Sequence, residues 1–148
     1  MTTIVIPGKN AEGESIAPLQ GLRFYNLDID YSLIGGYGGR WPTNYQRAEC
    51  AGNPERARMH LLNGEHTCGF YIRTDGRNIE QWKPVIATCY AWGACDELDK
   101  GARVEHVQIT GLAIHLPALR QAFSPSISVD AIERIKESLS KRYGVEVV

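Results

Sequence analysis

The chain has 148 residues, of which 43% are hydrophobic and 22% charged, a composition typical of one globular domain that can bury its core without disulfides. Sixteen Lys and Arg against seventeen Asp and Glu give a net charge of -1, which argues against a broad basic surface for duplex nucleic acid. The longest apolar stretch, residues 85–92, is far shorter than the ~20 residues of a membrane-spanning helix, so no membrane role is expected.

Residues 1–20 are rich in Pro and Gly and show no sustained hydrophobic periodicity, which predicts an irregular lead-in with at most a short edge strand over 3–6. The start of the chain has neither a basic segment nor an apolar run of signal-peptide length. We therefore expect a cytoplasmic protein. In a reducing compartment its four cysteines are expected as thiols or metal ligands, and Cys89 and Cys95, which lie among apolar residues, as buried thiols.

The domain proper is predicted to begin at residue 21. Residues 22–29 are rich in β-formers and alternate between hydrophobic and polar from residue 25 onward, as in a strand with one buried face. Residues 35–42 contain four glycines and end in proline, which predicts a loop. A short strand is expected over 45–50, followed by a helical turn that Asn53 caps and Pro54 begins.

The middle of the chain is predicted to form strands. Residues 66–73 lie between two turn signals and are typical of a strand, whereas 78–83 fit a helical turn or a loop equally. Residues 85–92 are almost continuously hydrophobic, which predicts a strand buried on both faces that Gly93 interrupts. A turn at 99–101 then leads into a strand over 102–109, so that the two strands form a hairpin.

The end of the chain is predicted to be a helix. Ser128 is a favourable cap, Asp130 suits the first turn, and a hydrophobic stripe recurs at helical spacing until Gly144 ends the pattern. The stripe consists of Ile132, Ile135 and Leu139. A short strand is expected over 145–148. These elements predict a single α+β domain over 21–148, with a mainly antiparallel sheet and a C-terminal α-helix.

Four pieces within residues 21–112 follow one another in a characteristic order. They are Gly21–Tyr25, Gly38–Trp41 with Cys50 downstream, Cys68–Tyr71, and Trp92–Gly93 followed by Gly101–Glu105. In this order they resemble a family of poorly characterised proteins of actinobacteria and their phages. The family has a segment similar to Cys-x-Cys-Gly-Ile-Tyr, and His66 stands here in place of its first cysteine. The resemblance implies a phage or mobile-element origin and brings no established activity.

Two cysteines and two histidines fall within the nineteen residues from 50 to 68, and thiolate and imidazole are the ligands that Zn²⁺ favours. These residues, Cys50, His60, His66 and Cys68, predict a closed structural zinc site. If 66–73 is a strand, His66 and Cys68 point to one face, and Gly69 lets the backbone approach the metal. The spacing matches none of the common zinc fingers. The alternative is a buried Cys68, a surface Cys50 and two solvated histidines.

Aromatic and cationic side chains alternate in and after the glycine-dense loop. This pattern suits stacking on bases or a protein-binding hot spot. The residues predicted to contact a partner are Tyr37, Arg40, Trp41, Tyr45 and Arg47. The alternative is that Trp41 and Tyr45 pack under the loop.

The hairpin segment is interpreted as structural. Gly101 is expected to close the turn, while Arg103 and Glu105 share one strand face and bond to neighbouring strands. As carboxylates, Asp96, Glu97 and Glu105 flank a turn and are expected to be solvated rather than catalytic.

Together these features predict a small, non-enzymatic, zinc-stabilised domain that binds another protein or regulates it. A single-strand or RNA-binding module that uses the aromatic loop is the alternative. A third hypothesis is a cysteine-dependent enzyme in which Cys68 or Cys95 pairs with His106 or His115.

Overall fold

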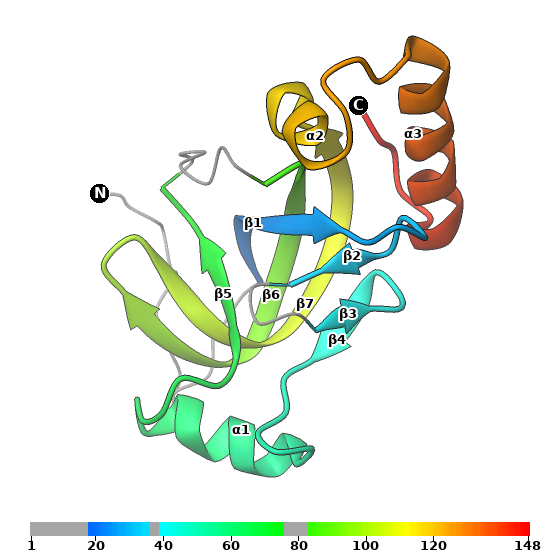
Figure 1. The fold of residues 1–148 in the computed structure, drawn as a ribbon. Helices are drawn as coiled ribbons and strands as arrows, with labels where there is room; N and C mark the ends of the chain where they lie inside the picture. The colour runs from blue at the N-terminus through cyan, green and yellow to red at the C-terminus, as the bar shows by residue number, and fades with distance from the viewer. Residues whose placement is uncertain (1–17, 36–38, 76–82) are drawn as a thin grey trace. The chain divides into compact units, whose positions relative to one another are not determined.

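A computed structural model describes residues 18–35, 39–75 and 83–148 of the chain (Figure 1). Their strands pair antiparallel, and a long helix lies near the C-terminus, which confirms the predicted α+β class. Most of the predicted lead-in, the short strand over 3–6 and nearly all of 78–83 lie outside the described residues. The elements in chain order are β1 (Leu19–Leu27), β2 (Leu33–Ile34), β3 (Arg40–Trp41), β4 (Tyr45–Arg47), α1 (Pro54–Leu62), β5 (Phe70–Arg73), β6 (Val85–Leu98), β7 (Gly101–Ile114), α2 (Leu116–Ala122) and α3 (Val129–Tyr143).

The chain divides into two compact units, to each of which it contributes several separate segments. Among the described residues, unit 1 comprises 18–23, 45–75 and 89–108, and unit 2 comprises 24–35, 39–44, 83–88 and 109–148. Strands β1, β6 and β7 contribute residues to both units.

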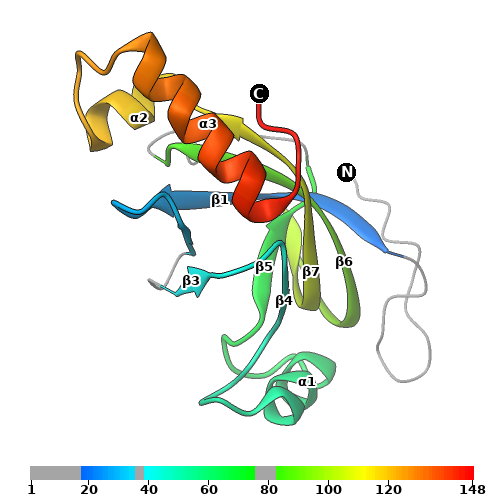
Figure 2. The same cartoon turned by 90° about the vertical axis from the view of Figure 1, so that its right-hand side faces the viewer.

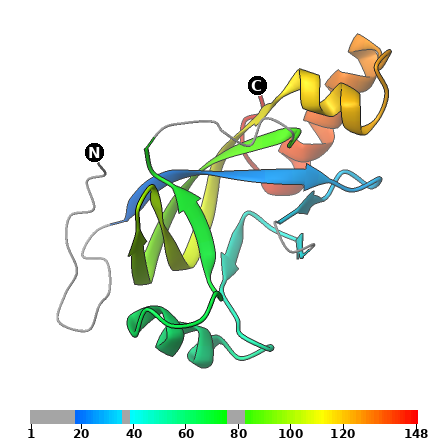
Figure 3. The ribbon, with the colours of Figure 1, turned by 60° about the vertical axis from the view of Figure 1, so that its left-hand side comes forward.

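In unit 1, β7 is the strand around which the others pair. It forms a hairpin with β6, and β5 and β4 pair with successive stretches of β7, from Phe70↔Val104 and from Arg47↔His106. Because a strand has two edges and β6 occupies one, β5 and β4 share the other. Figure 3 shows this hairpin and α1, the helix that joins β4 to β5 along the chain.

The hairpin differs from the prediction in two ways. Strand β6 continues past Gly93, which adopts a φ of +87°, a conformation that glycine reaches without steric cost. Its side chains also alternate: Cys89 and Ala91 are buried, whereas Tyr90 between them is exposed. The prediction of burial on both faces was therefore wrong, although the predicted burial of Cys89 and Cys95 is confirmed.

Helix α1 begins as predicted. The side chain of Asn53 accepts a hydrogen bond from the backbone N–H of Arg56, Pro54 starts the helix and Asn63 ends it. The flanking strands are shorter than expected, because β4 ends at Arg47 and β5 begins only at Phe70. Irregular backbone therefore surrounds α1 on both sides.

Unit 2 is organised by α3, which Ser128 caps and Gly144 ends in the left-handed conformation, as predicted (Figure 2). Its buried stripe is the predicted one, extended by Tyr143. The Tyr143 hydroxyl accepts a hydrogen bond from the N–H of Leu33 at 2.8 Å and donates one to the carbonyl of Trp41 at 2.6 Å. The predicted terminal strand is reduced to one parallel bridge, Leu112↔Val147, and α2 was not predicted.

Candidate metal centre

The four predicted metal ligands come from three parts of unit 1. Cys50 follows β4, His60 lies in the last turn of α1, and His66 and Cys68 lie in the segment between α1 and β5. A short backbone turn, in which Cys50 and Asn53 bond to each other, starts α1 directly after the first cysteine. The helix then carries the chain to His60, whose ring lies near the thiol of Cys50.

The four side chains converge, as predicted from their residue types. The Sγ atom of Cys50 lies 3.6 Å from Nδ1 of His66, and Nδ1 of His60 lies 3.3 Å from Sγ of Cys68. One ligand atom from each residue lies within 4.8 Å of all the others. In a tetrahedral zinc site with bonds of about 2.0–2.3 Å, neighbouring ligand atoms are about 3.3–3.8 Å apart. The cluster can therefore hold a metal ion after a small contraction.

The backbone around His66 and Cys68 is not the predicted strand. His66 adopts a φ of +63°, which side chains other than glycine rarely adopt, so the alternation argument for these two residues was wrong. Such a conformation costs of order 1–3 kcal/mol and persists where surrounding contacts impose it. Here it turns the imidazole of His66 toward Cys50. Sequence periodicity could not reveal this, because the contact depends on a turn.

Gly69 allows a close approach between the ligand segment and α1, whereas its predicted approach to the metal stays a prediction. Its φ is +99°, and a Cβ at this position would lie only 2.7 Å from Cδ2 of Leu61. Leu61 is buried on α1 directly after His60. Gly69 therefore lets the ligand segment approach the helix closely, so that the Cys68 and His60 side chains meet.

Of the two thiols in the cluster, that of Cys50 is buried and that of Cys68 is half-buried. Cys50 forms a small core with Ala48 and Ala57, against which Cys68 and Phe70 pack. Cys50 is only 9% exposed, so the alternative of a surface Cys50 was wrong. Burial, and then the neighbouring Cys50, raise the pKa of the Cys68 thiol. A bound cation would offset this cost, because a metal replaces the protons of the thiols.

Arg103 fastens the ligand segment to β7. Its guanidinium donates to the carbonyl oxygens of Cys68, at 2.8 Å, and Glu65, at 3.2 Å, and pairs with Asp96 at 2.7 Å. These contacts agree with the structural role predicted for Arg103. They also fix the backbone on both sides of His66.

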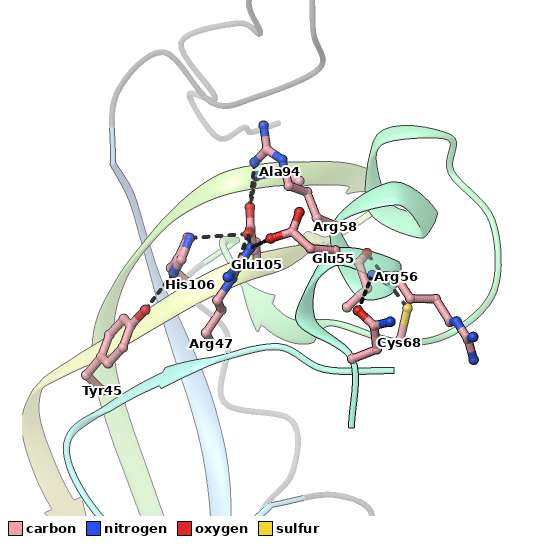
Figure 4. Close-up of polar contacts among 11 residues, drawn as sticks. Tyr45, Arg47, Glu55, Arg56, Arg58, Cys68, Ala94, Glu105 and His106 are labelled. Atoms are coloured by element: carbon pink, nitrogen blue, oxygen red, sulfur yellow. Dashed lines mark hydrogen bonds and ion pairs between the residues drawn. The ribbon is translucent and has the colours of Figure 1, made fainter. Parts of the chain in front are cut away.

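Glu105 holds α1 against the sheet, as Figure 4 shows. Its carboxylate is 1% exposed and accepts hydrogen bonds from Arg58 at 2.8 Å, Arg47 at 3.0 Å and the N–H of Ala94 at 3.0 Å. Burial by itself raises the pKa of Glu105, but these bonds outweigh burial and hold the pKa below its usual value. The expectation that Glu105 is solvated was wrong. Its bonds to β4 and α1 agree with the predicted structural role.

The residues predicted to contact a partner differ in their exposure. Arg40 is exposed and pairs with Asp28 and Asp30, whereas Trp41 is only 3% exposed and its ring meets that of Tyr25 at 5.2 Å. Trp41 therefore belongs to the core of unit 2, and the prediction that it contacts a partner was wrong.

The other three partner-binding predictions lie elsewhere. In unit 1, Tyr45 is 40% exposed, and Arg47 pairs with both Glu55 and Glu105. Tyr37 lies outside the described residues.

The cysteines and histidines of the predicted nucleophile and base pairs are divided between the two units. Cys68 contacts His60, while His106 contacts Tyr45 and Glu105. His115 belongs to unit 2, and Cys68 and Cys95 belong to unit 1.

The chain matches no protein-family model, and neither the curated proteins nor the solved structures include one detectably similar to it. Among the described residues, no helix is long and apolar enough to cross a membrane.

Proposed function

We propose that this protein is a zinc-stabilised module that acts by binding another protein. The observation that carries the proposal is the convergence of the ligand atoms of Cys50, His60, His66 and Cys68 within 4.8 Å of one another. Two thiolates and two imidazoles favour Zn²⁺ over the harder cations that prefer oxygen ligands. Four protein ligands leave no open position for a reactive water, so the metal has a structural role.

The charged and aromatic residues support a protein partner over a single-stranded nucleic acid. Trp41 is buried, and both Arg40 and Arg47 already pair with carboxylates. A groove that binds single strands needs cations for the phosphates and accessible rings for the bases. The residues of the predicted binding surface therefore provide fewer unpaired cations and fewer accessible rings than the sequence indicates.

Metal analysis of protein purified without chelators tests the zinc site. We expect about one zinc ion per chain, lost on substitution Cys50→Ser or Cys68→Ser. Cys89→Ser and Cys95→Ser are matched controls, because these thiols are buried in the same unit outside the cluster. Both controls should keep the metal. A zinc content near zero, with full stability in a strong chelator, would overturn the proposal.

Limited proteolysis gives a second measurement on the same proteins. Loss of the metal should make residues 51–64 sensitive to protease, because this segment has few large apolar side chains to offset the entropy of its ordering.

The class of the partner is tested by adding a single-stranded oligonucleotide to the protein. Binding that weakens steeply with salt would contradict a protein partner, because counterion release causes that dependence.

A further inference from the structure

Three rings from three strands of unit 1 lie together outside the metal cluster. They belong to Tyr45 of β4, Trp92 of β6 and His106 of β7. The rings of Trp92 and His106 are 5.3 Å apart with an angle of 9° between their planes, and Tyr45 lies 5.8 Å from Trp92 and 6.0 Å from His106. This packing fixes the orientation of the imidazole.

His106 joins an exposed hydroxyl to a buried carboxylate. Its Nδ1 lies 2.8 Å from the Tyr45 hydroxyl, and its Nε2 lies 3.4 Å from Oε2 of Glu105 (Figure 4). An ionised carboxylate only accepts hydrogen bonds, so the Nε2 that faces it carries the proton of a neutral imidazole. Nδ1 is then an acceptor directed at the phenolic hydroxyl.

The carboxylate end of this chain of contacts cannot move freely. Arg47, Arg58 and the N–H of Ala94 all bond to Glu105, and the side chain of Glu105 is only 1% exposed. The other end of the chain of contacts belongs to Tyr45, which is 40% exposed. A hydroxyl bonded to a base, with the base oriented by a third group, is the arrangement of an activated nucleophile.

We propose that Tyr45 is a nucleophile that accepts acyl groups from activated esters, with His106 as its general base. The phenolic oxygen attacks the ester carbonyl carbon while Nδ1 of His106 takes the phenolic proton. The bond between the carbonyl carbon and the leaving oxygen then breaks, and the leaving group takes that proton as an alcohol or phenol. The products are O-acyl-tyrosine and the free alcohol, and no oxidant or metal takes part.

Two other tyrosines of unit 1 provide internal references. Tyr71 is 43% and Tyr90 is 42% exposed, close to the 40% of Tyr45. The Tyr90 hydroxyl contacts the side-chain amide of Gln20 at 3.4 Å, a group that is not a base. The three residues are nearly equally exposed overall, so exposure does not predict a difference among their acylation rates.

The experiment treats the full chain with p-nitrophenyl acetate and measures acetylation at each tyrosine by peptide mass spectrometry. Because general-base assistance typically contributes 10²–10⁴-fold, we expect Tyr45 to react roughly 100-fold faster than Tyr71 and Tyr90. Equal rates at the three positions in the wild-type chain would overturn the proposal, and this comparison needs no variant.

The substitution His106→Ala tests the base. It should lower the Tyr45 rate to that of Tyr90, and added imidazole should restore it, which a merely structural role of His106 would not produce. The rates at Tyr71 and Tyr90 should stay unchanged, which shows that the variant remains folded. An undiminished Tyr45 rate in a folded His106→Ala variant would also overturn the proposal.

Discussion

The two units bury different kinds of side chains. Unit 2 buries the apolar stripe of α3, which ends in Tyr143. Unit 1 also buries apolar residues, but with them it buries the carboxylate of Glu105 and three arginines, Arg23, Arg73 and Arg103. Apolar burial depends mainly on the area removed from water, whereas a buried charge is tolerated only when its partners are in place. Unit 1 is therefore the more sensitive to loss of one polar group.

The largest effect is expected when the buried carboxylate of unit 1 is removed. Glu105→Ala leaves Arg47 and Arg58 without their shared partner, and breaking such a pair costs about 3–5 kcal/mol of the free energy of unfolding. Glu97→Ala, at an exposed carboxylate of the same hairpin, should change it by less than about 0.5 kcal/mol. Urea denaturation measures both. Equal small effects would show that the Glu105 pairs contribute no net stability.

A smaller loss in the free energy of unfolding is expected when the buried hydroxyl of Tyr143, on the apolar stripe of α3, is removed. Tyr143→Phe keeps the ring but leaves the Leu33 N–H without its acceptor, at a cost of about 1–3 kcal/mol. Tyr71→Phe, at an exposed ring, is the control and should be nearly neutral. A loss at Tyr143 as large as that at Glu105 would contradict the contrast between the units.

The smallest effect on stability is expected from Asp30, at the surface of unit 2, and it depends on pH. Hydrogen bonds from the side chain and backbone of Ser32, and then Arg40, lower the pKa of Asp30 from 3.8 to about 2. Because the folded pKa is the lower one, Asp30 stabilises the fold above about pH 4, and this contribution is lost as the pH falls toward 2. The melting temperatures of wild type and Asp30→Asn should differ slightly at pH 6 and converge near pH 2. A constant difference would contradict this.

The sequence predicts best those features that depend on near neighbours. The caps of α1 and α3 were identifiable because Asn53, Ser128 and Gly144 act within a few residues of themselves. The metal ligands were identifiable by residue type alone, since their convergence requires the irregular turn at His66. The resemblance to phage and actinobacterial proteins stays a prediction.

Features that depend on distant residues were missed. Glu105 has the sequence surroundings of a solvated carboxylate, and its partners include Arg47 and Arg58, which are 58 and 47 residues away. Trp41 follows a glycine-dense loop, a pattern equally compatible with exposure. Its burial depends on Tyr25 and Tyr143, which no local pattern connects to it.

The separation of Arg58 and Glu105 along the chain has a consequence for synthesis on the ribosome. The 47 residues between them take roughly 2–10 s to add at ~5–20 residues per second. Once Cys68 has been added, early in that interval, all four candidate metal ligands have been made, but the carboxylate that fixes α1 has not. A zinc ion bound at this stage would close the segment from Cys50 to Cys68 before β7 is made. Helix α1 would then be folded before the strand that it packs against.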